Sequence, residues 1–243
     1  MRFKDKVAIV TGAGQGIGEG YAKALAAEGA RVVVAELNEE QGERVAKEIG
    51  DALFVKVDVA DPASAAALAE ATMSAFGQID YLVNNAAIFH GMRREGLTTV
   101  DYDYLDRFLK VNLLGALHVT RAVLPYLKEG AAIVNQSSTA AWQATGFYGL
   151  AKAGINHLTA SLAAELGSRG IRVNAIAPGP TDTAAARMVI PEEYRSAMVQ
   201  SFALKRMGTT EDQAGALLFL LSDEASWVTG QVVAVDGGSV VRL

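Results

Sequence analysis

One tyrosine in this chain stands at a spacing suited to acid–base chemistry. Of the seven tyrosines, only Tyr148 has a lysine four residues later, Lys152. On a helix, this spacing places both side chains on one face. An ammonium about 4 Å from a phenol, at an effective dielectric near 20, is worth roughly 4 kcal/mol and lowers the phenol pKa by about three units before desolvation. We therefore expect Tyr148 to act as a general acid or base, with Lys152 lowering its pKa.

Polar side chains precede this pair at two places. The apolar run that begins at Ile133 ends in two hydroxyls, Ser137 and Ser138. A serine at the end of a strand can hold a substrate oxygen toward the tyrosine, and both remain candidates, with Ser138 the better match. Further upstream, Asn112 lies in an apolar helical stretch, where a buried amide needs hydrogen-bonding partners. A proton-relay water near Lys152 would satisfy it.

A glycine-rich loop follows the first apolar run. Gly12, Gly14, Gly16 and Gly18 stand at alternate positions, so the spacing is G-x-x-x-G-x-G, and Ile17 breaks the G-x-G-x-x-G pattern. Glycines permit a tight turn whose backbone N–H groups face a pyrophosphate at the start of a helix. The loop therefore predicts a dinucleotide site.

Acidic residues end the next two apolar runs. Glu36 can accept hydrogen bonds from the adenosine ribose hydroxyls and repels a 2′-phosphate, and neither Gln15 nor the two residues after Glu36 are basic. The sequence therefore favours NAD over NADP, although Glu36 could instead cap the following helix. Asp58 and Val59 end the third run, where a carboxylate could meet the adenine amino group.

Apolar runs alternate with helical patterns along the whole chain. We expect strands at 6–11, 31–35, 53–57, 80–83, 132–136, 172–177 and 231–235, and helices at 19–29, 39–49, 62–76, 101–128, 148–168 and 210–221. Strands that are apolar throughout and alternate with helices indicate a parallel sheet covered on both faces. We predict a single α/β domain over residues 1–243, a Rossmann-type doubly wound sheet of about seven strands that binds at their carboxyl ends.

Composition excludes several classes of protein. Hydrophobic residues make up 51% and charged residues 20%, which excludes general disorder. With no cysteine and only His90, His118 and His157, a metal site is not expected. The net charge of −5 without a basic run argues against nucleic-acid binding. No stretch is long and apolar enough to span a membrane or resembles a signal peptide, so we expect a cytoplasmic protein.

The stretch 183–208 interrupts the alternation. It contains no strand pattern, and a helix start is expected at Pro191, so we interpret it as a loop-rich lid over the binding edge. The expected substrate wall comprises Phe89, His90, Trp142, Phe147, Met188 and Met198. Such a lining suits an apolar secondary alcohol or ketone, cyclic or aromatic.

Taken together with the Asn84–Ala87 run, Pro178-Gly179, Val228–Gly230 and Asp236–Gly238, these motifs make the chain similar to single-domain short-chain dehydrogenase/reductases over almost its whole length. The resemblance implies a catalytic tetrad of Asn112, which holds the relay water, Ser138, which orients the substrate, Tyr148, which exchanges the proton, and Lys152. It implies cofactor contacts at Gly12, Gln15, Gly16, Ile17, Gly18, Glu36, Asp58, Val59, Asn85, Ala86, Ala87, Tyr148, Lys152, Pro178 and Gly179. Thr181 and Thr183 compete for the nicotinamide carboxamide. The resemblance also implies a homotetramer.

Two departures from the family pattern alter the expected site. Ala87 stands where the family usually has glycine, and Ser138 precedes Tyr148 by ten residues, a few fewer than usual. The loop between them must turn more tightly, which changes the pocket wall. The leading hypothesis is an NAD-dependent alcohol dehydrogenase or ketone reductase. The alternatives are a 3-oxoacyl-thioester (acyl-carrier-protein) reductase and a non-catalytic NAD-binding regulator or scaffold.

Overall fold

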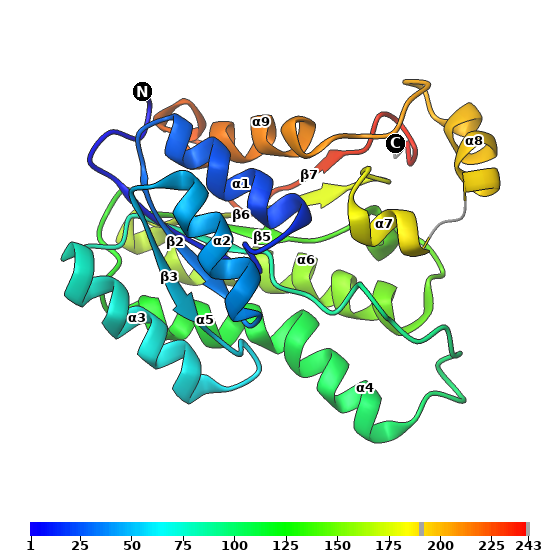
Figure 1. Cartoon of the computed structure of the whole chain (residues 1–243), viewed down its shortest axis with the longest axis horizontal. Coiled ribbons are helices and arrows are strands. Elements are labelled where there is room, and N and C mark those ends of the chain that lie inside the picture. Colours follow the sequence, from blue (N-terminus) through cyan, green and yellow to red (C-terminus); the bar gives the residue numbers. More distant parts are fainter. Residues whose placement is uncertain (190–191, 242–243) are drawn as a thin grey trace.

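The computed structural model describes residues 1–189 and 192–241, and its elements alternate as expected (Figure 1). The strands are β1 (Val7–Thr11), β2 (Arg31–Glu36), β3 (Ala52–Lys56), β4 (Tyr81–Asn84), β5 (Ala132–Gln136), β6 (Arg172–Pro178) and β7 (Val232–Val235). The α-helices are α1 (Gly16–Ala27), α2 (Glu39–Ile49), α3 (Pro62–Phe76), α4 (Tyr102–Leu109), α5 (Gly115–Val123), α6 (Gly146–Leu166), α7 (Ala184–Val189), α8 (Glu192–Ser201) and α9 (Thr210–Leu221).

The seven strands form one sheet in the order β3-β2-β1-β4-β5-β6-β7. Every pair is parallel, as in the register Val10↔Val34 between β1 and β2 and Val10↔Val83 between β1 and β4. The order reverses direction between β1 and β4, so the crossovers diverge there and leave room at the carboxyl ends of these strands. The predicted doubly wound α/β sheet is confirmed.

Helices cover both faces of the sheet, which explains why the strands are apolar throughout. In Figure 1, α1, α2 and α9 lie above the sheet, and α3, α5 and α6 lie below it. Within β1, Ala8 and Val10 belong to the first of these cores and Val7 and Ile9 to the second. All four are fully buried, and burying a side chain of valine or isoleucine stabilises the fold by about 1.5–3 kcal/mol.

The prediction of one continuous helix over 101–128 is wrong. A single π-helical turn, η1 (Lys110–Leu114), separates α4 from α5. A Cβ on Gly115 would lie 2.7 Å from Val59 Cγ2, so the absent side chain lets the helix approach the end of β3 closely. The α-helix ends at Val123 because Pro125, with no backbone N–H, cannot continue the hydrogen-bond ladder.

The segment predicted as a loop-rich lid contains two helices, α7 and α8, and the predicted start at Pro191 lies outside the described residues. Both ends of the segment meet at one point. Thr181 and Gly208 form an isolated bridge, Asp182 N donates to Gly208 O at 2.8 Å, and Gly208 N donates to Pro180 O at 3.0 Å. The segment is therefore a closed excursion from the end of β6.

Candidate functional site

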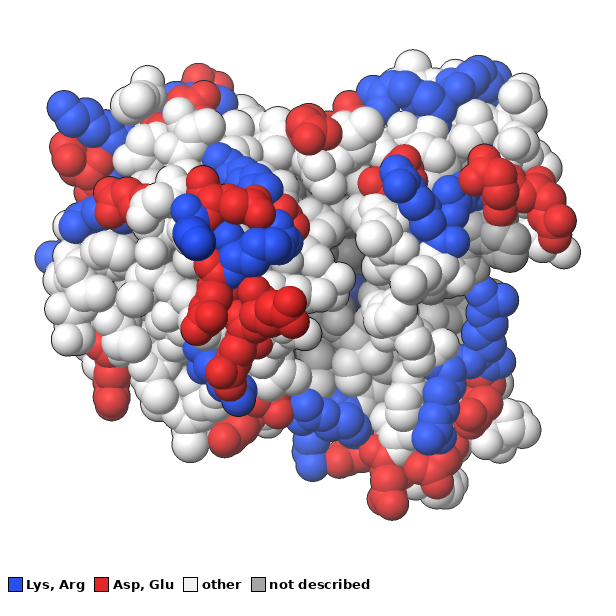
Figure 2. Space-filling model, in the orientation of Figure 1, with Lys and Arg blue, Asp and Glu red and all other residues white. Residues whose placement is uncertain are grey.

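A cavity of about 570 Å³ lies at the carboxyl ends of the central strands. Figure 2 shows this face of the molecule hollowed between α1–α2 and the lid helices. Every residue predicted to contact the cofactor lines it: Gly12, Gln15, Gly16, Ile17, Gly18, Glu36, Asp58, Val59, Asn85, Ala86, Ala87, Tyr148, Lys152, Pro178, Gly179, Thr181 and Thr183. The sheet thus brings together residues from six separate parts of the chain.

The glycine loop leaves no room for side chains. Gly12 has a φ of +64°, and a Cβ there would lie 2.8 Å from the Cα of Ala86. A Cβ on Gly18 would lie 2.1 Å from the carbonyl oxygen of Gly12. Asn85 closes the loop from the next strand, because its Nδ2 donates to Thr11 O at 2.9 Å and Gly12 O at 3.0 Å. The loop is a cradle that the absence of Cβ atoms keeps open, so it fits a dinucleotide pyrophosphate at the start of α1.

The carboxylate of Glu36 is held by backbone donors. Its Oε2 accepts from Gly14 N at 3.0 Å, and its Oε1 accepts from Leu37 N at 2.8 Å and Asn38 N at 3.1 Å. The helix-capping alternative does not hold, since the Asn38 side chain caps α2 by accepting from Gln41 N. Glu36 therefore presents a fixed negative charge at the wall of the cavity.

The far end of the cavity carries an ion pair that sequence reasoning missed. Arg107 on α4 lines the wall, and its Nη2 lies 2.9 Å from Asp58 Oδ2. Val111, one helical turn later, lines the same end. The only sequence signal for Arg107 was its four-residue spacing from Val111 on the predicted helix.

At the opposite end, Tyr148 and Ser138 face each other. The Ser138 side chain hydrogen-bonds the Tyr148 hydroxyl and accepts from Ala140 N at 3.2 Å. Ser137 is directed elsewhere, because its hydroxyl donates to Asn156 Oδ1 and lies 3.3 Å from Lys152 O. Of the two candidate serines, Ser138 has the geometry to hold a substrate oxygen beside the tyrosine.

The expected effect of Lys152 on Tyr148 is wrong in this arrangement. Desolvation raises the pKa of Tyr148, and the hydrogen bond with Ser138 offsets only part of that rise. The Lys152 ammonium is turned to Gln136 O, 2.8 Å away, and lies 5.9 Å from the centre of the Tyr148 ring. Lys152 is 3% exposed, and desolvation lowers its pKa to about 8. Desolvation, and not the four-residue spacing from Lys152, therefore sets the direction of the Tyr148 pKa shift.

Asn112 lies at the centre of the π turn and is buried. Its amide holds the backbone of one residue at both ends, since Oδ1 accepts from Ile88 N at 2.7 Å and Nδ2 donates to Ile88 O at 3.0 Å. The side chain therefore fixes the segment after β4 against the helix.

A second cavity, of about 10 Å³, separates Asn112 from Lys152 and Asn84. Among the described residues, no protein group donates to the buried Oδ1 of Asn84. A cavity of roughly 10–15 Å³ with polar walls holds one water molecule. The relay-water prediction thus has a polar space beside Lys152, and Asn112 lines the same space.

The two threonines after β6 differ in how they are used. Thr181 is 5% exposed, donates to Gly179 O at 3.0 Å, and accepts from Gln213 Nε2 at 3.2 Å. Thr183 lines the cavity, accepts from Ala186 N at 3.1 Å, and is less buried. Thr181 thus serves the base of the lid, and Thr183 is the better placed to meet a ligand.

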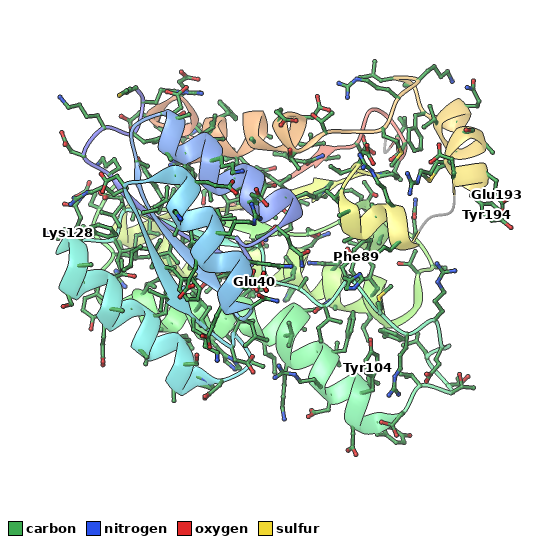
Figure 3. The ribbon with its side chains drawn as sticks, in the orientation of Figure 1. Glu40, Phe89, Tyr104, Lys128, Glu193 and Tyr194 are labelled. Carbon is green, nitrogen blue, oxygen red and sulfur yellow. The ribbon has the colours of Figure 1, made fainter. Side chains whose placement is uncertain are left out.

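Only some residues of the predicted substrate wall line the cavity. Phe89 and His90 line the cavity, and the Phe89 ring lies 5.8 Å from that of Tyr148 (Figure 3). Phe147 is a core residue, 3% exposed and 4.8 Å from the Phe108 ring, because the first turn of α6 directs it toward α4. Met188 is 71% exposed, since it lies on the outer face of α7.

The remaining two predicted wall residues also lie off the cavity. Trp142 ends a short 3₁₀ turn (Thr139–Trp142), and Met198 lies on α8; neither lines the wall. The positions that sequence reasoning missed are Ile88, Ala140, Gln143, Ala185 and Ala186. Ala185 and Ala186 follow Thr183 on α7, so a helix prediction there would have found these two.

Two classes of site are absent from the part of the chain that the structure describes. No group of three or more His, Cys, Asp or Glu residues is placed to hold a metal ion. None of the described helices is both long and apolar enough to cross a membrane.

Comparison with known proteins adds a family. Residues 12–240 match the family described as enoyl-(acyl carrier protein) reductase. An uncharacterized oxidoreductase of Mycobacterium tuberculosis H37Rv is 57% identical over 99% of both chains. A 3-oxoacyl-[acyl-carrier-protein] reductase of Thermotoga maritima is 37% identical, covering 99% of this chain and 100% of its own. A 7α-hydroxysteroid dehydrogenase of Bacteroides fragilis is 34% identical, covering 99% and 96%.

Solved structures agree with the fold. A short-chain dehydrogenase/reductase from Serratia marcescens superposes with a TM-score of 0.92 at 31% identity, covering 99% of this chain and 100% of its own. A short chain dehydrogenase from Burkholderia cenocepacia, solved in complex with NADP, gives a TM-score of 0.91 at 33% identity, covering 98% and 99%.

Proposed function

The chain belongs to the short-chain dehydrogenase/reductase family, and we propose that it is an NAD-dependent oxidoreductase of secondary alcohols and ketones. The observation that carries the proposal is one cavity with the Ser138–Tyr148 hydrogen bond at one end and the backbone-held Glu36 carboxylate at the other. A nicotinamide dinucleotide would supply or accept the hydride at the tyrosine end.

The side chains around the cavity have four roles in the proposed reaction. Ser138 holds the substrate oxygen within reach of Tyr148, whose hydroxyl gives or takes the proton. Lys152, anchored on Gln136 O, binds the nicotinamide ribose and carries a positive charge below a pH of about 8. Asn112 fixes Ile88 at the cavity wall, and the small polar cavity beside Lys152 holds a relay water. Phe89 excludes bulk water from the reacting end.

Glu36 supports NAD as the cofactor. Its charge is fixed by three backbone N–H groups, so it cannot easily turn away from a 2′-phosphate. Neither Gln15 nor Leu37, which also line that part of the cavity, carries a positive charge. The Burkholderia relative was solved with NADP, so this preference needs its own test.

Two substrate classes are supported. Phe89, Ala140 and Ala186 give the reacting end an apolar wall suited to a cyclic or aromatic secondary alcohol, and the relative from Bacteroides fragilis is named for a hydroxysteroid. The second candidate is a 3-oxoacyl thioester on an acyl carrier protein, which the Thermotoga relative and the matched family favour. A non-catalytic NAD-binding role is the remaining alternative.

The test is a panel assay with the purified protein. Cyclic, aromatic and aliphatic secondary alcohols are supplied with NAD or NADP, and 3-oxoacyl thioesters with NADH or NADPH, following absorbance at 340 nm. We expect turnover of cyclic alcohols with NAD and at least tenfold lower kcat/KM with NADP. Faster turnover of thioesters with NADPH would overturn both the cofactor and the substrate assignment. Tight NADH binding with no turnover on any substrate would favour the non-catalytic role.

Three further properties remain predictions. We propose a homotetramer, supported by exposed apolar residues at two places: Leu114 and Leu150 where η1 meets α6, and Trp227 after α9. Size-exclusion chromatography with light scattering tests it. The single catalytic domain with a lid at 183–208 and the cytoplasmic location likewise remain predictions made from the sequence.

A further inference from the structure

Arg107 and Asp58 close the end of the cavity farthest from the reacting tyrosine. Asp58 follows β3 at the edge of the sheet, whereas Tyr148 lies on α6, which follows β5, four strands away in the sheet order. Arg107 reaches Asp58 from α4, and both side chains line the cavity. The ion pair therefore belongs to the wall that a bound dinucleotide meets at its purine end.

Both carboxylate oxygens of Asp58 already accept a hydrogen bond. Oδ1 accepts from Ala60 N at 3.0 Å, and Oδ2 accepts from the Arg107 guanidinium at 2.9 Å. The exocyclic amine of adenine is a neutral donor, and a charged donor makes the stronger bond to a carboxylate. Any purine amine that turns to Asp58 must therefore share this carboxylate with the charged Arg107 guanidinium, which weakens its hydrogen bond.

The pair is open to solvent and is therefore not locked. The side chains of Arg107 and Asp58 are 46% and 32% exposed, and exposed ion pairs of this kind contribute little to stability. The next cation along the chain is Lys110, the first residue of η1, and its Nζ lies 2.7 Å from Asp106 Oδ2 instead. Removing the guanidinium should leave α4 folded and make Asp58 available to a ligand.

We propose that Arg107 controls how strongly the site distinguishes a dinucleotide that carries the adenine amino group from one that lacks it. By neutralising Asp58, Arg107 weakens this distinction. The inference rests on the proposed dinucleotide site. It concerns a residue for which the sequence suggested no role, and it predicts a change in binding preference rather than in turnover.

The experiment compares NADH with its reduced hypoxanthine analogue, which lacks the amino group. Dissociation constants for both are measured by the change in nicotinamide fluorescence for the wild type, Arg107→Met and the matched control Lys110→Met. In the wild type and the control we expect the two constants to agree within about threefold. In Arg107→Met we expect preference for NADH to rise about tenfold, the effect of one hydrogen bond.

A double variant tests the acceptor. Adding Asp58→Ala to Arg107→Met should return the preference to the wild-type value. A preference unchanged in Arg107→Met, or still raised after Asp58→Ala, overturns the inference while leaving the dinucleotide site intact. Failure of the wild type to bind either dinucleotide overturns the proposed function as well, so the two failures are distinguishable.

Discussion

The two ends of the cavity are built in different ways. The dinucleotide end consists of strand ends and the loops directly after them. They are tied by the backbone hydrogen bond from Gly12 N to Ala35 O at 2.8 Å and by the Asn85 side chain, which donates to the loop carbonyls. The substrate end combines the loop after β4 and the short 3₁₀ turn after β5 with the helices α6 and α7. The geometry of the dinucleotide end follows from the sheet, whereas that of the substrate end also depends on how loops and helices pack.

The lid illustrates the looser construction. Its charged residues pair with near neighbours in sequence, Arg187 with Asp182 at 2.8 Å and Arg195 with Glu192 at 3.1 Å. The Arg187–Asp182 pair is exposed, and a pair of this kind is worth about 0–1 kcal/mol. α8 buries none of its described residues, whereas α1 buries Tyr21 and Leu25 completely. The difference indicates that substrate preference can change without disturbing the dinucleotide end.

The largest effect is expected where the two ends meet. Tyr148→Phe removes the hydroxyl that we propose exchanges the proton, so kcat should fall about 10³-fold, within the range for general acid–base catalysis. The dissociation constant for NADH should change less than twofold. The control is Tyr102→Phe, an 87% exposed tyrosine on α4, which should behave as the wild type. Turnover that survives in Tyr148→Phe would assign the proton transfer to another group.

A substitution at Gly18 tests how rigid the dinucleotide end is. A Cβ there would lie 2.1 Å from Gly12 O, so Gly18→Ala forces the loop and α1 apart and should lower the free energy of unfolding by about 3 kcal/mol. Gly215→Ala is the matched control, since it lies within α9 with nothing within 4 Å of its Cβ. It should stabilise by about 0.5–1 kcal/mol. Equal midpoints in urea would mean that the loop is pliable.

Lys152, which lies between the two ends, makes the free energy of unfolding depend on pH. Its pKa is about 8 in the folded protein and about 10.5 in the unfolded chain, so the unfolded state binds more protons between these values. Stability should therefore rise with pH, by about 2 kcal/mol between pH 7.5 and 9.5. The measurement is urea unfolding at both pH values, with Lys152→Met as the control that lacks the rise. A rise of the same size in Lys152→Met would assign it to other groups.

The smallest effect sharpens the description of the substrate end. Phe89 lies beside Tyr148, so Phe89→Ala should raise KM for an apolar substrate about tenfold, an energy of about 1.4 kcal/mol. Met188→Ala should change KM less than twofold, because its side chain is 71% exposed. If Met188→Ala proved the more damaging change, α7 would have to turn its outer face inward when substrate binds.

The sequence made the sheet and the dinucleotide end predictable for a physical reason. Apolar runs fix which residues are strands, and the parallel arrangement then carries whatever follows each strand to one edge. The bounds of α2, β5 and α9 agree with prediction, and Glu36, Asp58 and Asn85 all reach the cavity.

What the sequence did not reveal depends on helix rotation and on burial. An inserted residue in the π turn rotates everything before it, so the approach of Arg107 to Asp58 could not be read from a continuous helix. Phe147 and Met188 differ only in which way their helices turn them. The Tyr148–Lys152 spacing likewise says nothing about desolvation, which sets the direction of both pKa shifts here.

The bridge between Thr181 and Gly208 gives the lid the character of an interchangeable module. Because its two ends are joined at one point, the intervening segment can be lengthened, shortened or replaced with only a slowly growing entropic cost of closure. A sheet that binds the dinucleotide can thus be combined with many different covers. Divergence among such chains would be concentrated in this excursion, and transplanting it between relatives is a direct route to altered substrate choice.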